Sequence, residues 1–226
     1  MSSESYFLLC WEAVLNHRSI RSYAILPAAG RSRRMGQPKL LLPWAGHTVI
    51  DQILAVWTSS AVERVVIIVR RDDIDLRRAC EKWPVTVVSP QQDPKDMKAS
   101  LQVGVQWLEE TVGPVGRDAC FLSPADIPGI SHNLIEALLE CYRRLHASAD
   151  EDVAPCQVVV PRFGERPGHP SLFRWHATKQ ITTLAEDEGL NRLVERLQKH
   201  FVDFSADERL PDIDTPAEYR KLRPET

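Results

Sequence analysis

A loop at residues 28–39 combines small residues with positive charge and is the segment best suited to chemistry. It contains no acidic residue, and its four cations are Arg31, Arg33, Arg34 and Lys39. It opens with the small residues Ala28, Ala29 and Gly30. Small residues let backbone amides approach a ligand closely, and arginine and lysine neutralise phosphate oxygens. The residue types therefore indicate a site for a polyanion such as a triphosphate, with a solvated basic loop as the alternative.

Two common phosphate-binding motifs do not describe this loop. The Walker A pattern G-x-x-x-x-G-K-[ST] fails because five residues separate Gly30 from Gly36 and Lys39 comes three residues later. The dinucleotide pattern G-x-G-x-x-G is also absent. A different kind of phosphate site is therefore expected.

The elements that position this loop alternate between strands and helices. Apolar runs predict strands at 23–28, 64–70, 85–88, 118–122 and 157–161. Apolar residues at helical spacing predict helices at 47–60, 72–82, 98–110, 131–145, 188–201 and 215–222. Extended arms are expected around the Gly/Pro-rich turn in 161–173, and an edge strand at 200–204. The pattern predicts an α/β fold with a doubly wound, mostly parallel sheet.

The two ends of the chain carry further signals. Spaced apolar residues predict a helix at 5–18, so residues 1–22 are interpreted as an N-terminal helical extension and 23–226 as one domain. Near the other end, Thr215, Pro216 and Glu218 have the order of a capping box with proline at the first helical position. Ser131 is a similar candidate for an N-cap.

Composition narrows the class of protein. The formal charge of −3, from 28 basic and 31 acidic side chains, argues against a surface that tracks nucleic acid. The apolar run at 6–15 is too short to span a membrane and has no basic segment before it. Five scattered cysteines without a C-x-x-C pair indicate buried thiols rather than a zinc site. A cytoplasmic protein is expected.

The run LPAAGRSRRMGQPKLLLPW at 26–44 resembles the signature L-A-A-G-x-[GS]-x-R-M-G-x-x-K of the MobA-like nucleotidyltransferase superfamily. It is most similar to the molybdenum cofactor cytidylyltransferase branch. The resemblance implies a Rossmann-like nucleotidyltransferase fold in which Arg34 and Lys39 grip a triphosphate. The nucleotide contacts that it implies are Ala28, Ala29, Gly30, Arg31, Ser32, Arg34, Lys39 and Ser100.

Carboxylates later in the chain match the family's metal site. SPADIP at 123–128 follows a predicted buried strand and is similar to the family's G-D-x-P motif, so Asp126 is the implied Mg²⁺ ligand, catalytic together with Arg34 and Lys39. Carboxylate oxygens suit Mg²⁺, although a lone D-x-P also occurs as a simple turn cap. DIDTPAEY at 212–219 resembles D-I-D-T-P-E-D, and Asp214 is favoured over Asp212 as a second metal ligand.

Segments in the second half match the family less completely. RPGHPSLF at 166–173 resembles G-H-P-x-L-F, which makes Gly168 and His169 candidate contacts to the acceptor substrate or else plain turn residues. The stretch 95–105 keeps Ser100 of the family pattern G-x-x-x-S-L, but bulky or charged residues at 96–98 replace small ones. This departure leaves room for a divergent activity.

The implied reaction is attack by an acceptor phosphate on the α-phosphorus of a nucleoside triphosphate, with release of pyrophosphate. Guanylyl-transferring relatives tend to have L-A-G-G where this chain has P-A-A-G, so the Cβ of Ala29 favours the smaller base of CTP. Molybdopterin or a related phosphorylated precursor is the expected acceptor, and residues 1–22 could recruit a molybdoenzyme. The alternatives are a sugar phosphate, polyol phosphate or phospholactate acceptor, or a catalytically silent nucleotide-binding module.

Overall fold

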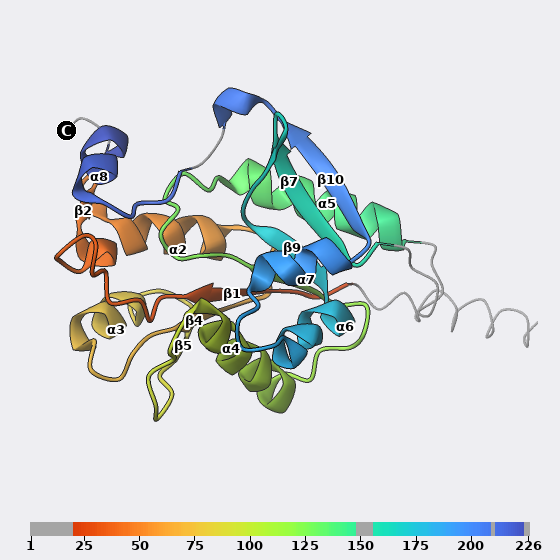
Figure 1. The fold of residues 1–226 in the computed structure, drawn as a ribbon, viewed down its shortest axis with the longest axis horizontal. Coiled ribbons are helices and arrows are strands. Elements are labelled where there is room, and N and C mark those ends of the chain that lie inside the picture. Colours follow the sequence, from red (N-terminus) through yellow and green to blue (C-terminus); the bar gives the residue numbers. More distant parts are fainter. Residues whose placement is uncertain (1–19, 148–155, 209–210, 224–226) are drawn as a thin grey trace, which may run out of the picture.

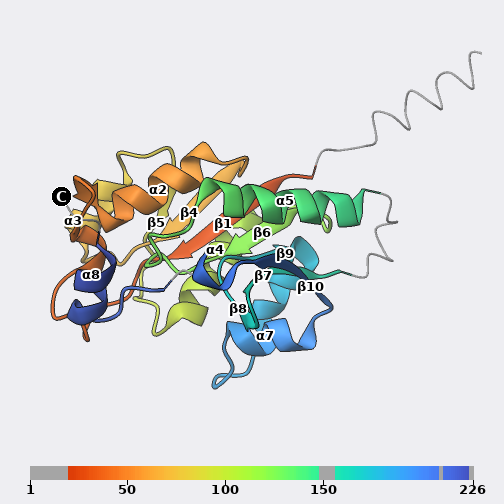
Figure 2. The same ribbon diagram turned by 90° about the horizontal axis from the view of Figure 1, so that it is seen from above.

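A central eight-stranded sheet with helices on both faces organises the molecule (Figures 1 and 2). The computed structural model describes residues 20–147, 156–208 and 211–223. The strands of the sheet are β1 (Ser22–Pro27), β4 (Arg64–Ile68), β5 (Thr86–Val88), β6 (Ala119–Leu122), β7 (Val158–Phe163), β8 (Arg166–Pro167), β9 (Ser171–Arg174) and β10 (Lys199–Phe204). A separate hairpin pairs β2 (Pro43–Trp44) with β3 (His47–Thr48).

The strand order is β10-β7-β9-β6-β1-β4-β5, with β8 paired to β7. Strands β6, β1, β4 and β5 run parallel, and β10 is parallel to β7. Only β8 and β9 pair antiparallel with their neighbours in the described sheet. The predicted α/β fold with a doubly wound, mostly parallel sheet is therefore confirmed. The antiparallel insertion of β9 between β6 and β7 was not predicted.

The helices divide the core into two apolar layers, one on each face of the sheet. The α-helices are α2 (Val49–Ser59), α3 (Ile74–Cys80), α4 (Met97–Thr111), α5 (His132–His146), α6 (Trp175–Thr178), α7 (Leu190–Arg196) and α8 (Pro216–Leu222). Alternate residues of β1 point to opposite faces: Ala24 packs in the layer of α2 and α5, and Ile25 in the layer of α4. Strand β1 is thus buried on both sides, as expected of a central parallel strand.

The local signals at the helix starts are confirmed. The Ser131 hydroxyl accepts a hydrogen bond from the amide of Leu134 at the start of α5. At the start of α8, Thr215 and Glu218 form the predicted reciprocal capping box, with Pro216 in the first turn. These short-range signals were readable because each involves residues only a few positions apart.

The predicted helix at 188–201 is too long. Helix α7 ends at Arg196, and the chain then extends into β10, which pairs in parallel with β7 at the edge of the sheet. Pairing with β7 overrides the helical pattern of the intervening residues, so the edge strand begins at Lys199 rather than at 200. The other helices predicted within the described residues are found with shifts of one or two residues at their ends.

The structure can be compared with the predictions about the N-terminal segment and about the cysteines. The N-terminal helix at 5–18 lies outside the described residues, so the division at residue 22 stays a prediction, and β1 begins at Ser22 itself. Cys80, Cys120, Cys141 and Cys156 are buried free thiols, as predicted, whereas Cys10 lies in the undescribed part. Among the described helices, none has the length and apolarity to cross a bilayer.

Candidate active site

The cationic loop leaves the carboxyl end of β1, at the edge where β4 and β6 also end. The amide of Ala28 donates to the carbonyl of Ile68 at 2.9 Å, which fixes the start of the loop against β4. Ser32 has a positive φ of 47°, and its carbonyl accepts from the amides of Met35 and Gly36, so the chain turns tightly there. The Ser32 hydroxyl accepts from the amide of Lys39 at 3.3 Å. The loop is thereby folded back on itself beside the sheet edge.

A cavity of about 530 Å³ lies between this loop, the segment 93–97 before and at the start of α4, and residues 124–126 after β6. Its position at the carboxyl ends of parallel strands is where open α/β sheets bind ligands. Of the predicted nucleotide contacts, residues 28–32, Lys39 and Ser100 line the cavity, and Asp126 lines it as well. The Ser100 hydroxyl donates to the carbonyl of Asp96, the N-cap residue of α4.

Lys39 lies between two carboxylates that the sequence places far apart. Its Nζ is 2.5 Å from Asp126 Oδ2 and 3.1 Å from Asp214 Oδ1. The other oxygen of Asp214 is 2.8 Å from the guanidinium of Arg34. Arg34 is 72% exposed and is not part of the cavity wall, whereas the other three side chains are largely buried. The structure therefore brings together all the residues predicted to be catalytic or metal-binding.

The protonation states follow from burial and from this pairing. Burial alone would lower the pKa of Lys39, but Asp126 and Asp214 outweigh it and hold that pKa above its ordinary value. Burial raises the pKa of Asp126, against the opposing effect of Lys39, and the charges of Asp212 and Asp214 add to the rise. Oδ1 of Asp126 is buried without a hydrogen-bond partner among the described residues. A second cation beside Asp126 would satisfy that oxygen and favour its ionised form.

Two hydrogen bonds, one from a backbone amide and one from a side chain, hold the C-terminal segment at the site. The amide of Ile213 donates to the carbonyl of Asp126 at 3.0 Å, and Ile213 itself is fully buried. The hydroxyl of Tyr219 on α8 donates to the carbonyl of Pro43 at 2.6 Å. These contacts hold Asp214, just before α8, beside the loop that follows β1.

The candidate acceptor contacts lie outside the cavity wall, on the connection from β8 to β9. The amide of Gly168 donates to the carbonyl of Pro161 at 2.9 Å. His169 is half-buried, and its Nδ1 is buried with no hydrogen-bond partner among the described residues. Burial lowers the pKa of His169, although the carboxylates of Asp126 and Asp212 act in the opposite direction. His169 is thus electrostatically coupled to Asp126 without lining the cavity.

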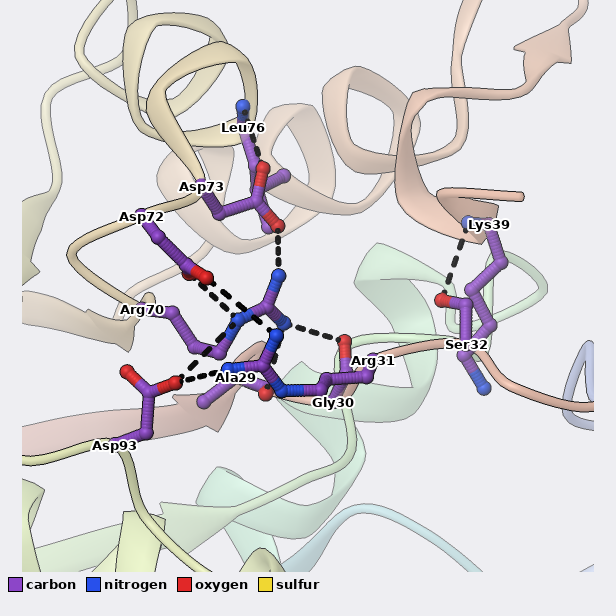
Figure 3. A network of polar contacts seen from close by, with 10 residues as sticks. All are labelled: Ala29, Gly30, Arg31, Ser32, Lys39, Arg70, Asp72, Asp73, Leu76 and Asp93. Carbon is purple, nitrogen blue, oxygen red and sulfur yellow. Dashed lines mark hydrogen bonds and ion pairs between the residues drawn. The ribbon is translucent and has the colours of Figure 1, made fainter. Parts of the chain in front are cut away.

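Sequence reasoning missed Arg70, which follows β4 at the same sheet edge. Its Nη1 donates to the carbonyls of Ala29 and Gly30 at 3.1 and 3.0 Å (Figure 3). Arg31 is held nearby, with Nη2 2.5 Å from Asp93 and Nη1 3.4 Å from Asp72. The available signal was positional, since a charged residue directly after a central parallel strand belongs at the ligand-binding edge.

The segment 95–98, which departs from the family pattern, is hydrogen-bonded to the loop at residues 185–186. Lys98 is buried, and its Nζ donates to the carbonyls of Ala185 and Glu186 at 2.5 and 2.9 Å. Lys95 pairs with the side chain of Glu186. Lys98, one of the residues that replace small ones, and its neighbour Lys95 therefore connect the start of α4 to the loop before α7.

An open α/β sheet with a cationic loop, a cavity and paired carboxylates at its carboxyl edge is typical of enzymes that act on nucleotides. The chain belongs to the MobA-like NTP transferase family, whose model matches residues 24–201, and it is a nucleotidyltransferase.

Similar proteins agree with this membership. A Bacillus anthracis protein named "Probable molybdenum cofactor guanylyltransferase" is 34% identical over 169 residues, covering 73% of this chain and 74% of the relative. The "Purine catabolism protein PucB" of Bacillus subtilis is 28% identical over 91% of this chain and 98% of its own length. Rv0371c of Mycobacterium tuberculosis H37Rv shares the fold, with a TM-score of 0.72, 23% identity, and coverage of 90% of this chain and 97% of that one. That protein's complex with manganese gives a TM-score of 0.68 and 22% identity, with coverage of 90% and 98%.

Proposed function

We propose that this chain transfers CMP from CTP to molybdopterin cofactor or a related phosphorylated acceptor, with release of pyrophosphate and dependence on Mg²⁺. The observation that carries this proposal is the junction of Lys39 with Asp126 and Asp214 at the edge of the cavity. It joins a lysine suited to phosphate with carboxylates suited to a divalent cation.

The cationic loop would hold the triphosphate through its side chains and its backbone. Lys39 and Arg34, which both pair with Asp214, would neutralise charge that develops on the α-phosphoryl group and the departing pyrophosphate. The acceptor phosphate is already a nucleophile, so no Ser-His-Asp arrangement is required. The contribution of the protein is positioning and charge stabilisation.

Asp126 and Asp214 are the residues that would hold Mg²⁺. The unpartnered buried Oδ1 of Asp126 fits a metal ligand, because a buried polar atom without a partner is costly. Among the described residues no group of three or more His, Cys, Asp or Glu side chains is arranged around one point. Such a sparse protein contribution is typical of Mg²⁺ that is also held by substrate phosphates and water. When bound, Mg²⁺ neutralises and orients the phosphates, and the manganese complex of the structural neighbour Rv0371c supports a divalent cation.

CTP is the proposed nucleotide because Ala29, which is buried and lines the cavity, carries a Cβ where a glycine would leave room for a purine. GTP is the second candidate, since relatives such as the Bacillus anthracis protein are named as guanylyltransferases. The two bases differ in size and in hydrogen-bonding groups, so one assay with both nucleotides separates them.

A molybdopterin-type acceptor is supported by the names of those relatives, and Gly168 and His169 are the proposed acceptor contacts. Sugar phosphates, polyol phosphates and phospholactate are the other acceptors to test. We further propose that the reaction takes place in the cytoplasm and that residues 1–22 contact a molybdoenzyme.

The decisive experiment measures pyrophosphate release from CTP and from GTP, with Mg²⁺ and each acceptor in turn. Release that requires CTP, molybdopterin and Asp126, tested with Asp126→Asn, supports the full proposal. A clear preference for GTP overturns the base assignment alone. Nucleotide binding that is indifferent to Mg²⁺ and to Asp126→Asn, without turnover of any acceptor, points instead to a silent nucleotide-binding module.

A further inference from the structure

Arg70 lines the cavity beside the cationic loop and hydrogen-bonds to that loop through two backbone carbonyls. One nitrogen, Nη1, donates to the carbonyls of both Ala29 and Gly30. The side chain of Arg70 is only 12% exposed, whereas Gly30 on the loop is exposed. Figure 3 shows the guanidinium lying between the loop and the start of α3.

The rest of the guanidinium is fixed by carboxylates of the segment before α3. Nε of Arg70 donates to Asp72 at 2.9 Å, and Nη2 donates to Asp73 Oδ2 at 3.2 Å. The other oxygen of Asp73 accepts from the amide of Leu76 and caps α3. Arg70 therefore cannot rotate freely, and the two loop carbonyls are tied to the helix start.

Fixing these carbonyls also fixes two amides. A trans peptide unit is planar, with its C=O and N–H pointing in opposite directions. The carbonyl of Ala29 shares its unit with the amide of Gly30, and the carbonyl of Gly30 shares its unit with the amide of Arg31. Both amides are thus turned away from the Arg70 guanidinium.

Those amides are free for a ligand. Within the described part of the chain, no backbone amide from residue 29 to residue 34 has a hydrogen-bond acceptor, although Gly30 and Arg31 line the cavity. Unsatisfied backbone amides beside a cavity form the kind of concavity that binds anions.

We infer that Arg70 is a positioning residue that presents the amides of Gly30 and Arg31 to the triphosphate of the bound nucleotide. The inference rests on the proposed function of the same cavity. Arg70 also lines the cavity, but each of its guanidinium nitrogens already has a partner in a loop carbonyl, Asp72 or Asp73, so we assign its effect to the loop. A lysine at this position keeps the charge but cannot span two carbonyls and two carboxylates.

The test uses the full chain with Mg²⁺ and measures the affinities for CTP and CMP by calorimetry, with GTP and GMP in parallel. Arg70→Lys is expected to weaken triphosphate binding about tenfold and monophosphate binding by less, because preorganised amides are lost along the phosphate chain. Arg162→Lys is the matched control, since Arg162 makes a two-pronged contact with Asp203 away from the cavity. It is expected to leave both affinities unchanged.

A second variant separates positioning from simple charge. In Asp73→Asn, the remaining side-chain oxygen still caps α3, because asparagine is as good an N-cap as aspartate. The group that faces Arg70 is then an NH₂ donor instead of a carboxylate oxygen. Removing a negative charge near a polyanion would tighten triphosphate binding if charge alone mattered. The inference predicts the opposite sign for Asp73→Asn, a weakening of a few-fold.

The outcomes are distinct. If the wild-type chain binds neither triphosphate, the proposed function fails. If the wild-type chain binds a triphosphate and the Arg70→Lys and Asp73→Asn variants bind it as tightly as the wild type, the positioning role of Arg70 is refuted while the proposed function stands. Equal losses for triphosphate and monophosphate, together with a lower melting temperature, show a general structural role and also overturn the inference. If Arg70→Lys does not fold, the sign of the change in Asp73→Asn decides.

Discussion

The Nζ of Lys39 lies 2.5 Å from Oδ2 of Asp126, although the two residues are 87 positions apart in the sequence. The lysine follows the loop after β1, and the aspartate follows β6, the neighbouring parallel strand. Without nucleotide, the lysine neutralises the carboxylates of Asp126 and Asp214. Under the proposed function, a magnesium–nucleotide complex would offer both sides better partners, since the lysine would gain phosphate oxygens and the carboxylates a divalent cation.

Replacing Lys39 by methionine tests this exchange of partners. Lys39→Met leaves two carboxylates close together with no amine between them, so the free energy of unfolding should fall by about 1–3 kcal/mol, less than for a fully buried pair. Turnover should fall by about 10²–10³-fold because a group that stabilises transition-state charge is lost. Mg²⁺ alone should raise the melting temperature of this variant more than that of the wild type.

The control for Lys39→Met is Lys179→Met, which removes one partner of an exposed ion pair with Glu109. That variant should show the wild-type response to Mg²⁺, because exposed pairs contribute little. An Mg²⁺ response of Lys39→Met no larger than that of the wild type would contradict a cation site between Asp126 and Asp214.

Ala29→Gly tests the choice of base. Removing the Cβ opens the wall of the cavity beside the loop, so the ratio of kcat/KM for GTP to that for CTP should rise by about tenfold, as is typical of one methyl group in a pocket. The measurement is pyrophosphate release with each nucleotide at saturating acceptor. An unchanged ratio would show that residues other than Ala29 set the base preference.

Gly168→Ala should destabilise the fold. A Cβ at this position would lie 2.6 Å from Cε2 of Phe163, whose ring is buried and packs against Phe204. Overpacking of this kind costs about 1–3 kcal/mol in the free energy of unfolding, measurable by urea titration. Gly116→Ala is the control, because its added Cβ meets no atom within 4 Å. Equal stability of the two variants would show that Phe163 can move aside.

His169 predicts a pH dependence of stability. Burial holds the pKa of His169 below the ordinary value of 6.5, so the unfolded chain takes up a proton more readily than the folded one. The free energy of unfolding contributed by this residue is therefore present above that ordinary value and is lost as the pH falls below it. The loss between about pH 7.5 and pH 5.5 should be smaller in His169→Gln than in the wild type. Parallel losses in the two proteins would contradict a buried neutral His169.

Local sequence patterns predicted the elements that depend on near neighbours. The strand and helix alternation, the Ser131 cap and the Thr215 capping box all arise from residues within one or two turns of one another. The boundary between α7 and β10 was misjudged because pairing with β7, some forty positions away, decides it. The antiparallel β9 likewise depends on its two neighbours in the sheet.

By itself, the sequence determined that a cationic, small-residue loop follows a central strand of an α/β sheet, because composition and periodicity are properties of short segments. Only the tertiary structure decided that Asp126 and Asp214 meet at Lys39, and that Arg70 holds the carbonyls of the loop. The physical reason for Asp126 and Arg70 is that parallel strands bring their carboxyl ends to one edge whatever their separation along the chain, whereas Asp214 is held there by the contacts of Ile213 and Tyr219. Strand order, which no single segment encodes, selects the residues that share that edge.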